Sequence, residues 1–180
     1  MMNNPDISKI LEFIQQKNKE QVDIETYIRI SLRIFEESKL LEDREYDKWI
    51  ELLDSSFEYI VLNRELKDKR ENHSSIITTP IIYDGIETIK IKLTRLKMYE
   101  AWSDNPPSKV KYFITNILAY KFLSGILVRS SVQLIKYRTT DTNMITYDRV
   151  DILNNQLKLQ KRVIIPDTSV FNIQDLTYIL

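Results

Sequence analysis

Residues 109–138 read KVKYFITNILAYKFLSGILVRSSVQLIKYR, a stretch rich in β-branched and aromatic residues, with hydrophobic side chains recurring at every second position. Period two is typical of β-strands, because successive side chains point to opposite faces of a sheet. One face of the first strand is expected to carry Val110, Tyr112, Ile114, Asn116 and Leu118. Ser124 and Gly125 supply a turn, so the stretch predicts two long strands paired as an antiparallel hairpin.

The strand pattern continues downstream of this hairpin. A polar segment, TTDTN, separates it from a third run at 144–153. Asn154 and Asn155 make another turn before a last strand at 157–165, which ends at Pro166. These short connections predict antiparallel pairing throughout.

One strand is also expected upstream. The segment SSFEYIVLNREL at 55–66 mixes aromatic and β-branched residues over a short length. The stretch at 65–80 is polar, contains a run of charged residues and ends in Pro80. We expect this second stretch to be a loop.

The N-terminal part carries the 3.6-residue period of helices. Hydrophobic residues at i, i+3, i+4 and i+7 predict one helix over 7–14 and a second over 24–35. The shared face of the second helix comprises Ile24, Tyr27, Ile28, Ser31 and Phe35. A third helix is expected near 46–53, with Asp43 as its N-cap.

A fourth helix is predicted between the first strand and the hairpin. Asp84 stands three residues before Glu87, the spacing of a capping box, in which each side chain accepts a backbone N–H of the other residue. Hydrophobic residues line the helix over 86–96, and it must end before Pro106 and Pro107 because proline disrupts a continuing helical turn.

This order of elements predicts an α+β domain with helices packed on one face of a long, curved, antiparallel sheet. The 180 residues, 43% of them hydrophobic, suffice for one core, so residues 1–180 are expected to form a single domain. A sheet of such long strands must twist into a cone. Its concave side can enclose a small ligand or be filled by side chains, and periodicity does not distinguish the two.

Composition excludes several classes of site. The chain has no Cys and one His, so it cannot by itself build an iron–sulfur cluster, a two-His-one-carboxylate iron site or a three-His zinc site. Only two Gly are present, which excludes glycine-rich phosphate loops. Equal numbers of basic and acidic residues, 26 each, give no global charge that would favour nucleic acid or an acidic membrane. Neither a signal peptide nor an apolar run of bilayer length is recognisable, so we expect a cytoplasmic chain.

Few side chains are candidates for chemistry. His73 lies between polar neighbours without companion ligands and is expected to be solvated. Asp148 and Asp151 could serve as a general base, but they lie on opposite faces of a strand, so at most one enters the concave side. Tyr112 and Tyr120 are expected in a core or an interface, with a pocket lining as the alternative.

Trp102 with Pro106 and Pro107 is the set most suggestive of a binding surface. Aromatic anchors are enriched at interface hot spots, and prolines hold a loop at low entropic cost. The alternative is that Trp102 covers the end of the preceding helix.

Two stretches resemble the β (small) subunit family of bacterial aromatic-ring-hydroxylating dioxygenases. The first, KLTRLKMYEAWSDNPPSKVKYFITNI at 92–117, matches at Arg95, Leu96, Ala101, Trp102, Asp104, Pro107, Ser108 and Asn116. The second, EESKLLEDREYDKWIELL at 36–53, matches at Glu37, Leu41, Asp43, Tyr46 and Trp49. Further matches are Asp148, Arg149, Arg162, Asp167 and the terminal DLTYIL. Together they cover about residues 25–180, leaving 1–22 as an extra N-terminal helix.

The resemblance implies a cystatin-like, NTF2-like (SnoaL-like) cone and a structural subunit without catalytic residues, metal or cofactor of its own. It implies a homotrimer of β subunits, joined to three catalytic α subunits that hold the Rieske 2Fe-2S cluster and the mononuclear iron of an oxidoreductase acting in aromatic hydrocarbon catabolism. Trp102, Pro106, Pro107 and Lys109 are then expected at a subunit contact. Lys109 replaces the usual Arg, and a lysine cannot form the bidentate contact of a guanidinium.

Two other functional classes remain open. A stand-alone NTF2-like isomerase or dehydratase would need a carboxylate, Tyr or His enclosed by apolar walls. A homo-oligomeric binding protein would need no α partner.

Overall fold

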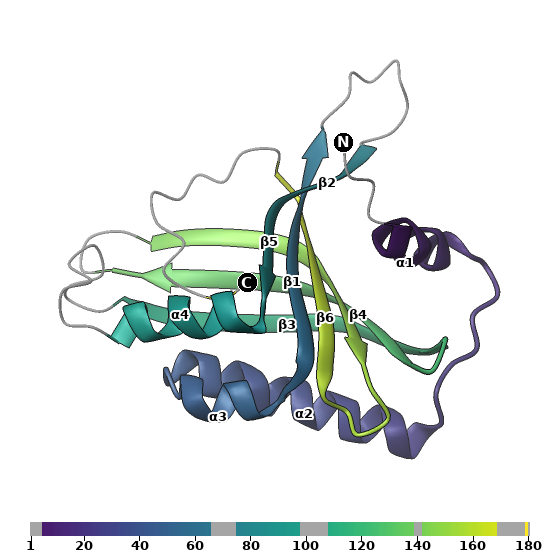
Figure 1. Cartoon of the computed structure of the whole chain (residues 1–180), viewed down its shortest axis with the longest axis horizontal. Helices are drawn as coiled ribbons and strands as arrows, with labels where there is room; N and C mark the ends of the chain where they lie inside the picture. The colour runs from purple at the N-terminus through teal and green to yellow at the C-terminus, as the bar shows by residue number, and fades with distance from the viewer. Residues whose placement is uncertain (1–4, 66–74, 98–107, 139–141, 169–178, 180) are drawn as a thin grey trace.

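The computed structural model describes residues 5–65, 75–97, 108–138, 142–168 and 179. Within these ranges four helices and six strands are formed (Figure 1). The helices are α1 (Pro5–Gln15), α2 (Ile24–Glu42), α3 (Tyr46–Glu51) and α4 (Ile86–Lys97). The strands are β1 (Leu53–Glu65), β2 (Ser75–Gly85), β3 (Lys109–Phe122), β4 (Gly125–Tyr137), β5 (Thr142–Leu153) and β6 (Leu159–Pro166).

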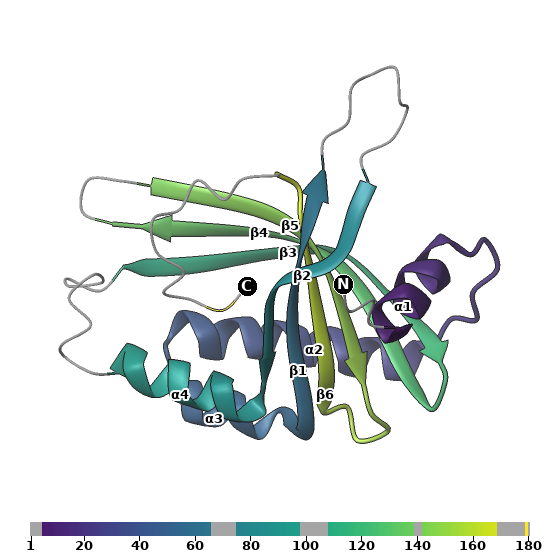
Figure 2. The same ribbon diagram turned by 45° about the horizontal axis from the view of Figure 1, so that its top comes forward.

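The described strands form one mixed sheet in the order β2-β1-β6-β5-β4-β3. β3, β4, β5 and β6 are successive antiparallel neighbours, which confirms the predicted meander. The pairing of β1 with β6 is parallel, so the sheet is not antiparallel throughout. Figure 2 shows the resulting curl, in which β3, β4 and β5 extend at a large angle to β1 and β6. The sheet is open, with β2 and β3 as its edges.

Helices cover both faces of the sheet. Hydrophobic residues of α2, α3 and α4 pack with one face, in a core that includes Ile34, Trp49 and Leu93. On the other face, Ile7 and Ile10 of α1 pack with residues of β1, β4, β5 and β6. The predicted α+β class is therefore correct, but the helices are not confined to one face. The extra N-terminal helix covers the hydrophobic residues on this second face of the sheet and shields them from water.

A bulge in β3 changes which residues face the helices. The pairing of β3 with β4 shifts between Thr115 and Leu118, and Asn116 adopts a left-handed φ of 54°. Before the bulge the inward residues are Val110, Tyr112 and Ile114, and after it they are Ile117 and Ala119. The predicted face is therefore wrong from Asn116 onward, because one extra residue reverses the alternation.

The junction between α2 and α3 differs from the prediction. Asp43 is the C-cap of α2, and its carboxylate accepts a hydrogen bond from Lys39 Nζ at 2.8 Å. Glu45 occupies the N-cap of α3 without a side-chain hydrogen bond. Between these caps Arg44 takes a φ of 60°, which ends α2 and moves the N-cap of α3 two residues beyond the predicted Asp43.

The predicted loop at 65–80 is partly a strand. Residues 75–80 belong to β2 and pair with β1, where Leu62 lies opposite Pro80. Pro80 is tolerated because β2 is an edge strand with an irregular register at this point. Residues 66–74 lie outside the described part of the chain.

The predicted helix over 86–96 is confirmed as α4, which buries Ile89 and Leu93. Asp84, expected to cap it, lies near the end of β2 and pairs with Lys92, about two helical turns along α4. The helix at 7–14 and the last strand are confirmed as α1 and β6. No helix among the described residues is long and apolar enough to cross a membrane.

The hairpin turn between β3 and β4 lies at Leu123 and Ser124, and Gly125 is the first residue of β4. Leu123 accepts a left-handed φ of 50°. A Cβ atom at Gly125 would lie 2.3 Å from the carbonyl oxygen of Leu153 on the neighbouring strand. Glycine is therefore required there by close backbone approach.

Candidate functional site

Several of the sequence-predicted site residues cannot be placed. His73, Trp102, Pro106 and Pro107 lie outside the described residues, so their predicted roles stay predictions. Lys109 is the first residue of β3 and has an exposed side chain.

The two candidate carboxylates on β5 have separate environments, as their opposite parity predicted. Asp148 is half-buried and accepts hydrogen bonds from Arg129 Nη2 at 2.8 Å and Ser131 Oγ at 3.1 Å, both on β4. Asp151 points to the face covered by α2 and is 2% exposed. Only Asp151 therefore enters the interior between sheet and helices.

Asp151 belongs to a buried group of ions that we call the charged cluster. It joins α2 to the centre of the sheet and comprises Arg33 and Glu37 of α2, Arg149 and Asp151 of β5, and Arg162 of β6. The sequence places these charges on one side by simple periodicities, i and i+4 on the helix and i and i+2 on the strand.

Arg162 is the centre of the charged cluster and is fully buried. Its Nε and Nη2 donate to the two carboxylate oxygens of Asp151 at 2.8 and 2.9 Å, a bidentate pair. Nη2 also donates to Glu37 Oε1 at 2.7 Å. Burial by itself would lower the pKa of Arg162, but the two carboxylates raise that pKa well above its ordinary value.

Glu37 is held ionised by its neighbours. Its Oε1 accepts a hydrogen bond from the indole nitrogen of Trp49 at 2.9 Å, and Arg33 and Arg149 lie 3.7 and 4.0 Å from its carboxylate. Burial opposes ionisation, yet Arg162, Arg149 and Arg33 together lower the pKa of Glu37 to about 2. A general base needs a pKa near the working pH, so Glu37 is poorly suited to proton abstraction.

The charged cluster is not fully hydrogen-bonded. It holds three arginines and two carboxylates, which leaves one positive charge in excess. Buried atoms without a hydrogen bond include Arg33 Nε, Arg149 Nη2, Arg162 Nη1 and the hydroxyl of Tyr147. Burial lowers the pKa of Arg33, which lies at the solvent side of the group. Such a network fixes the position of α2 on the sheet more than it stabilises the fold.

The two candidate tyrosines are in different cores. Tyr112 packs in the core beneath α2, and its hydroxyl donates to the carbonyl oxygen of Ile179 at 2.5 Å. Burial raises the pKa of Tyr112 well above its ordinary value. Tyr120, beyond the bulge, contacts the ring of Phe13 edge-on at 6.3 Å on the opposite face. Both tyrosines therefore serve as core residues.

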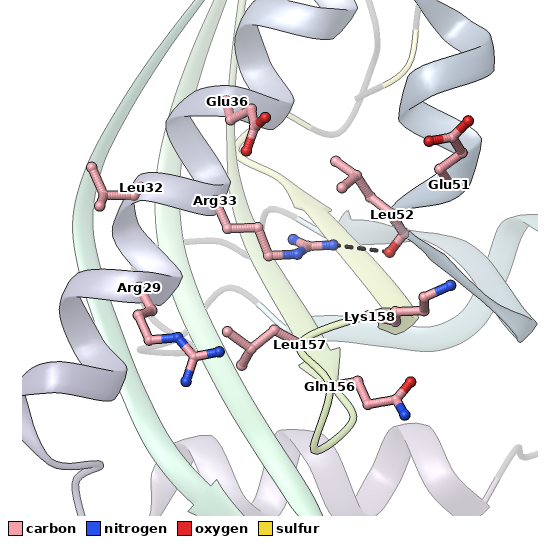
Figure 3. Close-up of a pocket in the computed structure, with 9 residues that line it drawn as sticks. All are labelled: Arg29, Leu32, Arg33, Glu36, Glu51, Leu52, Gln156, Leu157 and Lys158. Carbon is pink, nitrogen blue, oxygen red and sulfur yellow. Dashed lines mark hydrogen bonds between the residues drawn. The ribbon is translucent and has the colours of Figure 1, made fainter.

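An open hollow of about 400 Å³ lies beside the charged cluster. Figure 3 shows the guanidinium of Arg33 pointing across it from α2, with Nη2 donating to the carbonyl oxygen of Leu52 at 3.1 Å. Its lining residues are Arg29, Leu32, Arg33, Glu36, Glu51, Leu52, Gln156, Leu157 and Lys158. Both basic and acidic residues line the hollow, and no nucleophile with an adjacent base is found among its lining residues.

Sequence reasoning did not single out the charged cluster as a site. Glu37, Trp49, Arg149 and Arg162 entered only as matches to a family pattern. A usable signal was present: Arg162 directly precedes the apolar run VIIP within a predicted strand, and a charge within a buried strand needs a partner. Within the described residues no three His, Asp or Glu side chains are grouped to hold a metal ion.

The chain is similar in structure to several solved proteins. A naphthalene 1,2-dioxygenase with indole bound in the active site aligns at 19% identity over 100% of both chains, with a TM-score of 0.79. The beta subunit of the benzoate 1,2-dioxygenase from Burkholderia mallei ATCC 23344 aligns at 14% identity over 89% of this chain and 99% of that chain, with a TM-score of 0.62.

A scytalone dehydratase candidate from Novosphingobium aromaticivorans DSM 12444 aligns at 14% identity over 79% of this chain and 85% of that chain, with a TM-score of 0.53. At such identities the likenesses establish the fold, an NTF2-like curved sheet with packed helices. The predicted fold class is thereby confirmed.

Residues 36–173 match the family described as ring hydroxylating beta subunit. The matched range includes Glu37, Asp151 and Arg162 of the charged cluster, and it confirms the resemblance found in the sequence. The chain belongs to the ring hydroxylating beta subunit family.

Proposed function

We propose that this chain is a non-catalytic, structural β subunit of a Rieske-type aromatic-ring-hydroxylating dioxygenase. In this role it organises the oxygenase hexamer with the catalytic α subunit. The observation that carries the proposal is the charged cluster, most of which lies within the matched family range, because both of its carboxylates are paired with arginines and the pairs tie α2 to the sheet.

The stand-alone enzyme alternative would need an enclosed acid or base, and Glu37 and Asp151 of the charged cluster are buried carboxylates between α2 and the sheet. A carboxylate with a pKa of about 2 retains little affinity for a proton near neutral pH. Asp151 is bound at both oxygens by Arg162, so neither oxygen is directed at a substrate position. These contacts support a rigid core in preference to a reacting site.

The redox centres of the proposed oxygenase lie on the α subunit, which would hold the Rieske 2Fe-2S cluster and the mononuclear iron. The β chain has no Cys and a single His, so it lacks the ligands for either centre. In this proposal the β chain contributes a contact surface for the α subunit and a rigid support. A trimer of β subunits beneath three α subunits would hold neighbouring α subunits at a fixed separation, so that electrons pass between them without a diffusive search.

The test is co-expression with the tagged Rieske-type α subunit from the same source, followed by light scattering of the purified complex. We expect one species with α and β in equal numbers and with three copies of each. Recovery of both proteins as unassociated chains would contradict the proposal. So would iron bound to the β chain purified alone, or turnover of an aromatic compound by it.

The predicted contact at Trp102 is tested in the same experiment. Trp102→Ala is expected to reduce recovery of the α subunit at least about tenfold, as for a buried aromatic anchor. Ile91→Ala is the matched control, because Ile91 is an exposed hydrophobic residue of α4 that the proposal does not use. Equal recovery with both variants would remove Trp102 from the proposed contact.

A further inference from the structure

The hollow beside the charged cluster is bounded by a cation with unused donors, Arg33. Its side chain is 8% exposed, and its guanidinium points across the hollow (Figure 3). Nη2 donates to the carbonyl oxygen of Leu52 at 3.1 Å, whereas Nε and Nη1 are buried without a hydrogen bond. The carboxylate of Glu37 lies 3.7 Å from Nη1, which is beyond hydrogen-bond distance. Buried donors are normally satisfied, so this guanidinium retains capacity for an acceptor.

The two carboxylates of the charged cluster are committed to other donors. Both oxygens of Asp151 accept from Arg162, and Oε1 of Glu37 accepts from Arg162 and Trp49. Burial lowers the pKa of Arg33, whereas the carboxylates raise the pKa of Arg162. The positive charge in excess is therefore least compensated at Arg33, where the charged cluster meets the hollow.

Two further cations lie beside Arg33 in the lining. Arg29 stands one turn earlier on α2, and Lys158 belongs to the turn between β5 and β6. Both side chains are exposed. The wall that carries Lys158 is held in place, because Asn154 Oδ1 accepts the backbone N–H groups of Gln156 and Lys158, each at 2.9 Å. Three cations from two elements thus face one hollow.

The rest of the lining limits the class of ligand. Leu32, Leu52 and Leu157 supply apolar surface, and Glu36 and Glu51 supply two negative charges. The lining and the charged cluster together hold five basic and four acidic side chains, so a single negative charge would neutralise the group. The two glutamates would repel an anion of higher charge. A volume of about 400 Å³ is within the range of small-molecule sites.

We propose that this hollow binds a small monocarboxylate with an apolar body. The carboxylate lies on the guanidinium of Arg33, and the hydrocarbon part lies against Leu32, Leu52 and Leu157. A rotation about the last side-chain torsions of Arg33 presents an unused N–H group to the ligand. The planar guanidinium fork matches the two oxygens of a carboxylate. This inference concerns binding of a small molecule to the single chain and does not depend on the proposed function.

Hexanoate is the probe, and hexanamide and inorganic phosphate are the comparisons. Isothermal titration calorimetry of the full chain, at about pH 8 and constant ionic strength, measures the three dissociation constants. We expect saturable binding of hexanoate and at least about tenfold weaker binding of both comparisons, because hexanamide lacks the charge and phosphate is then mainly a dianion. Absence of saturable hexanoate binding would overturn the proposal. Equal binding of hexanamide or phosphate would overturn it as well.

Substitution of Arg33 locates the site. Arg33→Gln leaves two buried arginines facing two carboxylates, and it is expected to weaken hexanoate binding at least about tenfold. Arg95→Gln is the matched control, since Arg95 is an exposed arginine of α4 remote from the lining, and it should bind hexanoate as the wild type does. Hexanoate binding that survives Arg33→Gln unchanged would overturn the assignment.

Two variants of exposed lining residues keep the test decisive should Arg33→Gln fail to fold. Arg29→Gln is expected to weaken hexanoate binding about threefold, because it removes a nearby positive charge. Glu36→Gln is expected to strengthen it by a similar factor and to raise the affinity for phosphate more. The same effect of both substitutions on hexanoate, or no effect of either, would contradict an anion site in this hollow.

The same chemistry has a second source, a carboxylate side chain of an adjoining subunit. The titration is therefore repeated on the purified complex with the α subunit, where we expect hexanoate binding to be retained. Loss of binding on assembly would overturn a free ligand and assign the hollow to the adjoining subunit. If no complex forms, the proposed function fails, while the result for the single chain still stands.

Discussion

Helices α1 and α2 distribute their hydrophobic and charged residues differently. Helix α1 follows the usual pattern, with Ile7 and Ile10 buried against the sheet. Helix α2 instead buries Arg33 and Glu37 together with hydrophobic residues, and leaves an apolar stripe exposed, which comprises Ile24, Ile28, Leu32 and Phe35. The difference shows that hydrophobic periodicity locates a helix without fixing which side faces the core.

The burial of charges on α2 has a physical basis in the sheet. Charges on α2 can be buried because Arg149, Asp151 and Arg162 of β5 and β6 lie opposite them. A buried ion is tolerated when ions of opposite sign and hydrogen bonds surround it. On the outer side of α2, Ile24, Ile28, Leu32 and Phe35 are exposed in the described chain, so they contribute little to the hydrophobic core. The following substitutions test this division.

Removal of the central carboxylate is expected to have the largest effect. Glu37→Gln would leave three buried arginines with Asp151 alone, and loss of one partner from a buried ion network costs about 3–5 kcal/mol of unfolding free energy. Urea denaturation followed by circular dichroism measures this. Glu36→Gln, one residue earlier and exposed, is the matched control, with an expected change below about 0.5 kcal/mol. Equal effects of the two substitutions would show that the charged cluster is not tightly coupled.

The same carboxylate predicts a pH dependence. The pKa of Glu37 is depressed to about 2 in the folded chain, from an ordinary value of 4.5. Its contribution to stability is therefore complete above about pH 4.5 and is lost as the pH falls toward 2. The difference in urea midpoint between wild type and Glu37→Gln should shrink over this range. A difference that stays constant with pH would mean that the carboxylate is not held ionised.

Much of the fold is predictable from the sequence, and the exceptions have local causes. Period two located β3 to β6, and the 3.6 period located α1, α2 and α4. The inward face of β3 was wrong beyond Ile114 because a bulge at Asn116 leaves no periodic signal before pairing is known. The parallel pairing of β1 with β6 joins segments more than 100 residues apart, since Glu58 pairs with Lys161, and short-range turn rules cannot anticipate it.

The charged cluster was less predictable than the fold. The opposite orientation of Asp148 and Asp151 followed from strand parity. The contact between Glu37 and Arg162 did not, because these residues are 125 apart in sequence and meet only when α2 packs on the sheet. Sequence shows that a charged residue lies next to an apolar run in a strand, and tertiary structure decides which opposite charges contact it.

A smaller effect is expected from the indole of Trp49. Trp49→Phe keeps an aromatic ring against Phe57 but removes the N–H donor to Glu37. Hydrogen bonds to charged groups contribute about 1.5–3 kcal/mol, so we expect a loss of about 2 kcal/mol in urea denaturation. In the Glu37→Gln background the same substitution should cost less, because the acceptor is no longer charged. Additive costs would argue against coupling between the two residues.

Tyr147 is expected to respond in the opposite direction. Its hydroxyl is buried without a hydrogen bond, and burial raises its pKa above the ordinary value. Tyr147→Phe removes an unsatisfied polar atom at nearly constant volume, so stability should rise by about 1 kcal/mol. Tyr59→Phe is a suitable comparison, since Tyr59 is equally buried but has an interaction partner. If Tyr147→Phe destabilises the chain, its hydroxyl has a partner after all, such as a buried water.

The smallest change in stability is expected on the apolar stripe. Ile28→Gln alters an exposed residue of α2, so the unfolding free energy of the isolated chain should change by less than about 0.5 kcal/mol. Ile34→Gln, two turns along the same helix and 1% exposed, should cost several times more because it buries an unpaired amide. Urea denaturation at a concentration where sedimentation finds no association isolates these folding terms. A large loss from Ile28→Gln under that condition would place the stripe within the folding unit and remove the distinction between the two sides of α2.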